Sequence, residues 1–137
     1  MKISDYEAVY ELWEATEGMG LRSMDDSKNG ISKFINRNPN TNFVCRINDK
    51  VVGAILSGHD GRRGYIYHTA VNDLYRNKGI GKSLVKVAVN ALADEGIKKA
   101  ALVVFVDNKK GNAFWESIGF FERDDLNYRN IVIDEMK

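Results

Sequence analysis

The strongest constraint on the fold of this chain is a glycine-rich, basic turn at the start of a strongly amphipathic helix. Residues 76–83 stand between an apolar run that ends at Val71 and a helix expected over Gly79–Glu95, where apolar residues recur at helical spacing. Gly96 stands where a left-handed helix C-cap belongs. A strand–turn–helix junction exposes unpaired backbone N–H groups at the positive end of the helix dipole, and glycine lets an anion approach them. The turn therefore predicts a pyrophosphate cradle, formed by Arg76, Asn77, Lys78, Gly79, Ile80, Gly81, Lys82 and Ser83.

Three known phosphate-binding patterns can be compared with this turn. A Walker A loop ends in Gly-Lys-Ser, as residues 81–83 do, but it needs a glycine where this chain has Arg76. A dinucleotide-binding fingerprint needs a glycine at Leu84, and it normally follows the first strand of a βαβ unit. The third pattern, Arg/Gln-x-x-Gly-x-Gly/Ala, is matched fully by Arg76, Gly79 and Gly81.

Periodicity and turn residues divide the rest of the chain into the elements of one α/β domain that spans residues 1–137. The uniformly apolar run Ala100–Val106 predicts a strand covered on both faces. Further helices are expected over residues 4–16, 25–36 and 112–118. Further strands are expected over 42–47, 51–56, 65–71, 120–123 and 128–134, with a polar hairpin loop at 57–64.

The third pattern is the signature turn of the GNAT superfamily of acetyl-CoA-dependent N-acetyltransferases, which this sequence resembles. Ala70–Tyr75 is similar to the family segment that leads into the turn, although Asp73 replaces the usual proline. Phe114–Phe120, which follows Asp107-Asn108, resembles the family's later helix and its Gly-Phe ending. The resemblance implies acetyl-CoA as co-substrate, and it leaves at most residues 1–3 for the opening strand that the family normally has.

The resemblance also implies a mixed, mostly antiparallel central sheet that is flanked by helices and splayed between the family's fourth and fifth strands. The strand that ends at Val71 is then expected to carry a bulge. A backbone N–H freed there, at Ala70 or Val71, would polarise the thioester carbonyl, and the pantetheine would pair with the strand edge. Asn108 is expected beside the pantetheine or the thioester.

Acetyl transfer to an amine requires a neutral amine, so a base has to collect a proton. Many family members have a glutamate where this chain has Tyr65. Tyr67, which could order a proton-carrying water, and His68, whose residue type titrates near neutral pH, are the candidates for that role. The alternative for both is a packing role in the core, which we favour for His68.

Trp115 stands where the family commonly has a tyrosine that protonates the departing thiolate, and an indole N–H cannot serve as that acid. Trp115 is therefore expected to pack along the co-substrate, while Tyr128 becomes a candidate proton donor or the thiolate leaves unaided. Because neither a clear base nor the tyrosine acid is present, a CoA-binding regulatory module without catalysis is the alternative.

Composition limits the partners. The net charge of +1 predicts no general affinity for nucleic acid or an anionic membrane. The single cysteine, Cys45, and the two histidines have no metal-ligand spacing, so no metal is expected. The absence of a leader-like segment predicts a cytoplasmic protein. The acceptor is expected to be a small amine, a lysine or a peptide N-terminus, and exposed aromatics such as Tyr128 leave a homodimer open.

Overall fold

The computed structural model describes residues 1–21 and 23–134, which form two compact units, Met1–Phe105 and Val106–Lys137. The second unit holds the helix α5, Lys109–Ser117. The helical elements of the first unit are η1 (Ile3–Asp5), α1 (Tyr6–Glu14), α2 (Ser23–Asp26), α3 (Lys28–Arg37), η2 (Asp73–Tyr75) and α4 (Ile80–Asp94). Its strands are β1 (Phe43–Ile47), β2 (Lys50–His59), β3 (Gly64–Val71) and β4 (Ala100–Ala101).

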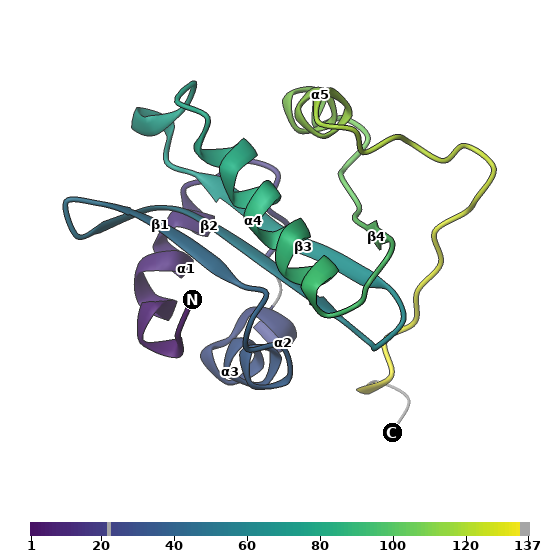
Figure 1. Cartoon of the computed structure of the whole chain (residues 1–137), viewed down its shortest axis with the longest axis horizontal. Helices are drawn as coiled ribbons and strands as arrows, with labels where there is room; N and C mark the ends of the chain where they lie inside the picture. The colour runs from purple at the N-terminus through teal and green to yellow at the C-terminus, as the bar shows by residue number, and fades with distance from the viewer. Residues whose placement is uncertain (22, 135–137) are drawn as a thin grey trace. The chain divides into compact units, whose positions relative to one another are not determined.

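One sheet with the strand order β1-β2-β3-β4 forms the centre of the first unit (Figure 1). The first three strands pair antiparallel, and β4 pairs parallel to β3, which confirms the predicted mixed, mostly antiparallel sheet. Pairing between β3 and β4 is limited to Gly64 with Ala100 and Tyr65 with Ala101. Most of the outer edge of β3 therefore has no strand partner in the first unit.

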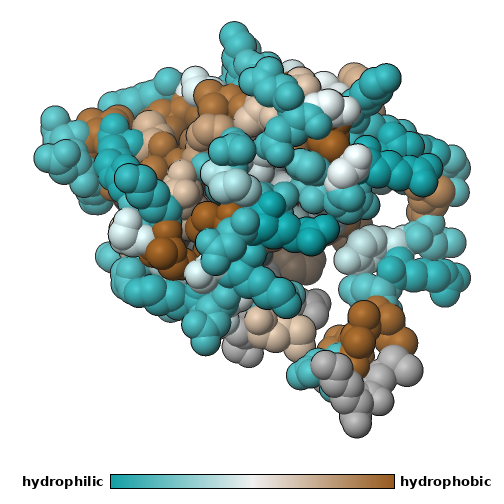
Figure 2. Space-filling model, turned by 60° about the horizontal axis from the view of Figure 1, so that its bottom comes forward, coloured by the Kyte–Doolittle hydropathy of each residue, from teal (hydrophilic) through white to brown (hydrophobic). Residues whose placement is uncertain are grey.

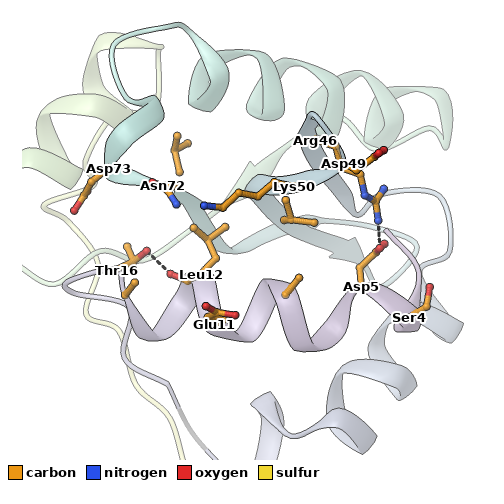
Figure 3. A pocket seen from close by; sticks show the side chains of 14 residues that line it. Ser4, Asp5, Glu11, Leu12, Thr16, Arg46, Asp49, Lys50, Asn72 and Asp73 are labelled. Carbon is orange, nitrogen blue, oxygen red and sulfur yellow. Dashed lines mark hydrogen bonds and ion pairs between the residues drawn. The ribbon is translucent and has the colours of Figure 1, made fainter.

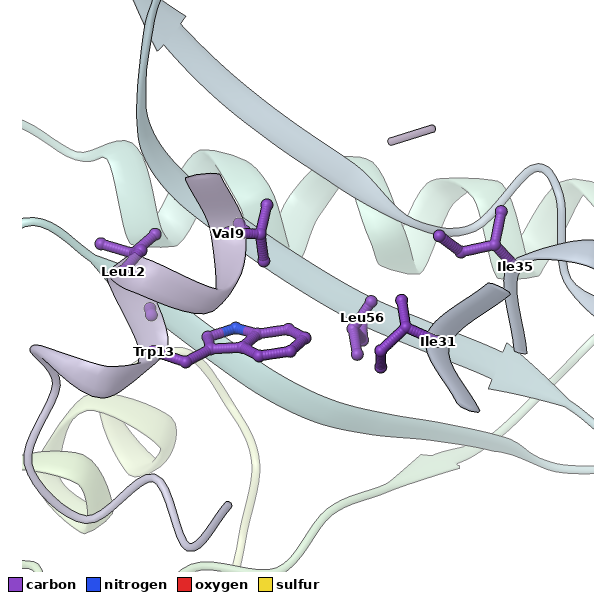
Figure 4. Packing of buried hydrophobic residues seen from close by; sticks show 8 residues of the cluster. Val9, Leu12, Trp13, Ile31, Ile35 and Leu56 are labelled. Atoms are coloured by element: carbon purple, nitrogen blue, oxygen red, sulfur yellow. The ribbon is translucent and has the colours of Figure 1, made fainter. Parts of the chain in front are cut away.

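Helices cover both faces of this sheet. A Cβ atom at Gly53 of β2 would lie 3.0 Å from the Ile80 side chain and 3.1 Å from that of Leu84, so α4 packs tightly on one face. The opposite face carries α1 and α3, whose apolar side chains meet those of β2 and β3 (Figure 4). That core consists of Val9, Leu12, Trp13, Ile31, Ile35, Ala54, Leu56 and Ala70.

The helix expected over residues 25–36 is two helices. Ser27 interrupts it, because its backbone is extended and its hydroxyl accepts a hydrogen bond from the Gly30 N–H at 3.1 Å, which caps α3. A Cβ atom at Gly30 would lie 2.4 Å from the Asp25 carbonyl oxygen. Gly30 therefore allows the close approach between the end of α2 and the first turn of α3.

The polar hairpin loop expected at residues 57–64 is present, but its bounds are wrong, since β2 continues through His59 and β3 begins at Gly64, which leaves residues 60–63 for the loop. Ser57 is fully buried, and its backbone N–H and hydroxyl bond to Asn42 and Thr41. A Cβ atom at Gly58 would lie 2.6 Å from the Asn38 side chain. Small and polar residues are thus required inside this strand, where they resemble a loop in sequence.

The strand expected over residues 100–106 is also wrong beyond Ala101. Alternate side chains there are exposed, so the segment is not covered on both faces; Val103 is 58% exposed and Phe105 57%. An apolar run favours a strand only where a neighbouring edge accepts its hydrogen bonds, and the pairing with β3 ends at Ala101. The strands expected near 120–123 and 128–134 are not formed in the described part of the second unit either.

No strand precedes β1 in the described residues, and the ammonium of Met1 donates to the Asn42 carbonyl at 2.7 Å. Hydrophilic side chains dominate the visible face in Figure 2, with apolar side chains interspersed. Over residues 1–21 and 23–134, no helix is long and apolar enough to cross a membrane.

Candidate active site

The turn predicted to bind phosphate connects the end of β3 to α4 and is braced from within. The Asn72 side chain accepts from the Leu74 N–H at 2.9 Å and caps η2. The Arg76 Nε lies 3.0 Å from Asp73 Oδ1 and 3.4 Å from the Val71 carbonyl oxygen. Arg76 therefore fixes the shape of the turn, and its guanidinium remains partly exposed.

The start of α4 presents open backbone. Gly79 has φ +77°, and a Cβ atom at this position would meet no atom within 4 Å. Asn77, at φ +62°, is a second left-handed residue of the turn. No side chain caps α4 at Gly79, and the first backbone bond of this region runs from the Ser83 N–H to the Gly79 carbonyl at 3.0 Å. The first-turn N–H groups therefore point outward without a helical acceptor.

Charge around this helix start favours an anion. Lys78 lies with its Nζ 5.6 Å from the centre of the Tyr75 ring, and Lys82 and Ser83 are exposed. The first turn of α4 contains no acidic residue. The start of α4 therefore fits a pyrophosphate, because it combines open space at Gly79 with uncapped N–H groups and two lysines. These N–H groups, Lys78 and Lys82 could hold the anion.

The bulge expected in β3 lies at Tyr67–His68 rather than at Ala70 or Val71. The register shifts from Ile55 opposite Thr69 to Ser57 opposite Ile66, so β3 has one extra residue here. Two consecutive side chains consequently point to the same face of the sheet, the face that α1 and α3 cover. The Tyr67 ring lies 5.3 Å from that of Phe34 on α3, while the His68 ring lies 4.8 Å from that of Trp13 on α1.

Ala70 and Val71 pair regularly with β2, but their backbone groups point in opposite directions. The Asn72 N–H donates to the Val52 carbonyl at 2.8 Å, and antiparallel pairing alternates, so the N–H of Ala70 also faces β2. The N–H of Val71 then faces the outer edge, which has no partner strand at this point. Of the two expected amides, Val71 is the one whose geometry suits an incoming carbonyl.

His68 is held by a carboxylate that sequence patterns did not reveal. The His68 Nε2 lies 2.7 Å from Asp26 Oδ1, and both side chains are largely buried. The Tyr6 hydroxyl donates to the Asp26 carbonyl at 2.6 Å, and burial raises the pKa of Tyr6. Asp26 lies 42 residues before His68 in sequence, so no local spacing could have indicated the pair.

Tyr67 is the other predicted candidate base of the first unit. Its side chain is 50% exposed, and the centre of its ring lies 4.6 Å from that of Tyr65, the residue at the family's glutamate position, with the two rings tilted. The rings of Tyr65, Tyr67 and Phe34 form one aromatic row beside His68. Tyr67 therefore contributes an aromatic ring to this row and also presents a hydroxyl group.

The remaining predicted residues, Asn108, Trp115 and Tyr128, belong to the second unit. Asn108 caps α5, because its side chain accepts from the Gly111 N–H at 2.9 Å. The Trp115 ring packs between Phe114 and Phe120, with ring centres 5.1 Å apart in both pairs. Tyr128 is 68% exposed. Within this unit Asn108 and Trp115 therefore have structural roles, and Tyr128 lies on its surface.

A cavity of about 460 Å³ opens between α1 and the hairpin of β1 and β2, and it reaches the end of β3 (Figure 3). Val71 and Asn72 line it at that end. Figure 3 shows the ion pair of Asp5 with Arg46 in the wall and the Lys50 side chain extending across the cavity. Both signs of charge are present, so the cavity does not favour an anion as the turn does.

The model of the acetyltransferase (GNAT) family matches residues 6–120, which include every element from α1 to α5. The chain belongs to the GNAT acetyltransferase family. An acetyltransferase of Pectobacterium atrosepticum is 29% identical over 96% of this chain and 92% of its own length. An acetyltransferase of Sodalis glossinidius is 31% identical over 89% of this chain and 84% of its own length.

A solved GNAT structure has the same fold. The PaiA N-acetyltransferase of Thermoplasma acidophilum, solved in complex with coenzyme A, superposes with a TM-score of 0.78 at 20% identity, over 90% of this chain and 88% of that one. Membership of the GNAT family makes the protein an acyltransferase that uses acetyl-CoA. Among the described residues, no three His, Cys, Asp or Glu side chains gather closely enough to hold a metal ion.

Proposed function

We propose that this GNAT protein is an N-acetyltransferase that moves the acetyl group of acetyl-CoA to a primary amine by direct attack, with both substrates bound. The acceptor is a small amine, a lysine or a peptide N-terminus. The observation that carries the proposal is the uncapped, lysine-flanked start of α4, which directly follows a strand whose last amide faces an open edge.

The co-substrate is proposed to bind along this path. Its pyrophosphate would contact Lys78, Lys82 and the N–H groups that follow Gly79. Its pantetheine arm would extend along the outer edge of β3, where pairing with β4 has ended, as in the predicted splay between these strands. The Val71 N–H would then donate to the thioester carbonyl oxygen, which becomes more negative as the amine attacks.

The reaction must dispose of two protons. An acceptor enters as an ammonium and loses one proton to a base. The base then passes this proton on to water. Its nitrogen forms a bond to the acetyl carbon, the carbon–sulfur bond breaks, and the electron pair of that bond leaves with the sulfur. The second N–H proton neutralises the thiolate, so the products are an amide, CoA thiol and one released proton.

Residues of the second unit enter the proposal through the family resemblance. Asn108 is proposed to contact the pantetheine and Trp115 to pack along it, while Tyr128 is the candidate donor to the thiolate. A thiol with a pKa near ~8.5 also leaves without a donor. Cys45 is a free thiol, which suits the proposed cytoplasmic setting. Exposed Tyr128 keeps a homodimer among the proposals.

Thermal unfolding with acetyl-CoA, CoA, ATP and NAD in parallel tests the binding part. A ligand at a hundredfold excess over its dissociation constant stabilises the folded state by about 2.7 kcal/mol, which raises Tm by several degrees. Stabilisation by acetyl-CoA and CoA alone is expected. Stabilisation by ATP alone would refute the proposal and favour a Walker A loop.

Turnover tests the chemical part. Release of CoA thiol from acetyl-CoA is measured with Nα-acetyl-lysine amide, an Ala-Gly-Gly peptide and phenethylamine as acceptors. Amine-dependent release is the expected result. Tight CoA binding without release with any amine would instead support the regulatory module.

A further inference from the structure

We infer that Asp26 and His68 act as a pair that removes the proton from the acceptor amine. His68 is the catalytic residue, and its Nδ1 receives the proton. Asp26 is a positioning residue, because it acts through His68 and not on the amine itself. The inference rests on the proposed acetyl transfer and adds to it the base that the glutamate position, occupied by Tyr65, does not supply.

The contact between the two side chains fixes which ring nitrogen carries the proton. A carboxylate accepts hydrogen bonds and cannot donate them, so the 2.7 Å contact places the N–H of neutral His68 on Nε2. Nδ1 is then the atom with a lone pair. It has no hydrogen-bond partner in the part of the chain that the structure describes. A proton taken by Nδ1 produces an imidazolium that Asp26 stabilises.

The surroundings of His68 hold the ring in place without occupying Nδ1. From α1, the Trp13 ring contacts it at an interplanar angle of 68°, and the Tyr6 hydroxyl binds the backbone of Asp26. From α2 comes Asp26 itself, and on β3 the bulge directs Tyr67 to the same face. Among the residues that the structure describes, these contacts place three titratable groups around the ring, namely the Asp26 carboxylate and the phenols of Tyr6 and Tyr67.

The regular part of β3 after the bulge sets the distance between the proposed base and the proposed oxyanion donor. His68 and Val71 are three residues apart on one strand, or about 10 Å at the usual rise of a strand. This separation leaves room for an amine nitrogen, the acetyl carbon and one water that carries the proton to Nδ1. Proton removal and carbonyl polarisation are thus both assigned to β3.

The chain contains a matched control pair. His59 Nε2 lies 2.9 Å from Glu95 Oε1, but its Nδ1 already accepts the Gly61 N–H at 2.9 Å. Glu95 is the C-cap of α4, so this pair lies at the opposite end of a 15-residue helix from the phosphate turn, roughly 22 Å away at 1.5 Å per residue. Each of the two histidines has its own carboxylate partner at Nε2. They differ in whether Nδ1 is available to take a proton.

The kinetic test compares His68→Gln and Asp26→Asn with His59→Gln and Glu95→Gln, using Nα-acetyl-lysine amide, an Ala-Gly-Gly peptide and phenethylamine. General-base loss is worth about 100-fold or more, so His68→Gln is expected to lower kcat by that factor at pH 7. At pH 10 the deficit shrinks to below about tenfold, because an amine with a pKa near ~10.4 loses its proton unaided. Asp26→Asn is expected to lower kcat by about tenfold at pH 7.

The KM for acetyl-CoA should be unchanged in both variants, and both control variants should stay within about twofold of the wild type. A purely structural role for His68 would lower activity equally at all pH values. Thermal unfolding of each variant establishes that it is folded before its rates are compared.

A second experiment measures the tautomer of each histidine and does not depend on enzyme activity. Long-range 1H–15N spectra of the wild-type protein resolve two imidazoles, since the chain has two histidines. Both rings are expected with the proton on Nε2 when neutral, and His59→Gln identifies which signals are which. Asp26→Asn should give a mixture of tautomers at His68 alone.

Three outcomes would overturn the inference. One is a proton on Nδ1 of neutral His68 in the wild type. Another is wild-type turnover that His68→Gln changes by less than about threefold at pH 7, which would leave the proposed function intact and remove the pair from it. The third is a wild type that binds CoA but transfers acetyl to no amine, which would refute the proposed function and the pair together.

Discussion

Replacing Gly79 by alanine should weaken acetyl-CoA binding far more than it weakens folding. Gly79 has φ +77°, where an L-residue costs about 1–2 kcal/mol. For a chain of this size each kcal/mol lowers Tm by about 3–6 °C. The new methyl group meets no protein atom within 4 Å, so it adds no clash, but it stands in the space through which a phosphate reaches the N–H groups of α4.

Gly96→Ala is the matched control for that change. Gly96 has φ +83°, also has no atom within 4 Å of a new Cβ, and ends the same helix. Its N–H bonds to the Ala93 carbonyl at 2.9 Å, and the Ile97 N–H bonds to the Leu92 carbonyl at 3.1 Å, which is a Schellman cap. Both variants therefore place alanine at a left-handed φ angle, and only one of them fills the predicted cradle.

Thermal unfolding of both variants with and without acetyl-CoA separates the two effects. At a fixed ligand concentration of a hundred times the wild-type dissociation constant, the wild type gains about 2.7 kcal/mol. A tenfold loss of affinity in Gly79→Ala reduces that gain to about 1.4 kcal/mol. Gly96→Ala should keep the full gain. If Gly79→Ala also kept it, or if both variants lost it equally, the phosphate cradle would be misplaced.

Three further changes test other parts of the molecule. Gly58→Ala should destabilise the fold by about 1–3 kcal/mol in urea unfolding, because its Cβ would lie 2.6 Å from the Asn38 side chain and 2.8 Å from the Phe34 ring; an unchanged midpoint would contradict this packing. Backbone N–H groups of Arg63 and Arg62 lower the pKa of Asp60 in the folded state. The stabilising effect of Asp60 is therefore present above the unfolded-state pKa and is lost as pH falls through the folded-state pKa. Asp60→Asn should flatten the decline in Tm between about pH 4 and pH 2, and an acid profile identical to that of the wild type would refute this. Trp115→Phe should weaken acetyl-CoA binding and turnover, and if both stayed at the wild-type level, the proposed packing of Trp115 along the co-substrate would be wrong.

Local chemistry explains which parts of the fold could be predicted. The start and end of α4 depend on residues next to the element, and Gly96 has the positive φ angle that a left-handed C-cap requires. The buried face of α1 follows from spacing alone, since Val9 and Trp13 are four residues apart on one side of the helix and both are completely buried. Where a segment's own residues decide its structure, sequence patterns are sufficient.

Tertiary partners explain which parts could not be predicted. Ser57 and Gly58 lie in a strand because Thr41, Asn42 and Asn38 surround them, and nothing next to them in sequence announces this. Asp26 is similarly invisible until the fold brings it to His68. The apolar run after Ala101 shows the opposite case, since high strand propensity does not create a neighbouring edge for it to pair with.

The short pairing of β3 with β4 has a consequence for handling the protein. Within the first unit, the outer edge of β3 beyond Tyr65 offers a row of backbone donors and acceptors to any extended chain, including a second molecule. Such an edge is a template for aggregation, and its effect grows with protein concentration. A co-substrate that lies along the edge would block that growth. Purification in the presence of CoA should therefore keep concentrated protein monodisperse, independently of any gain in Tm.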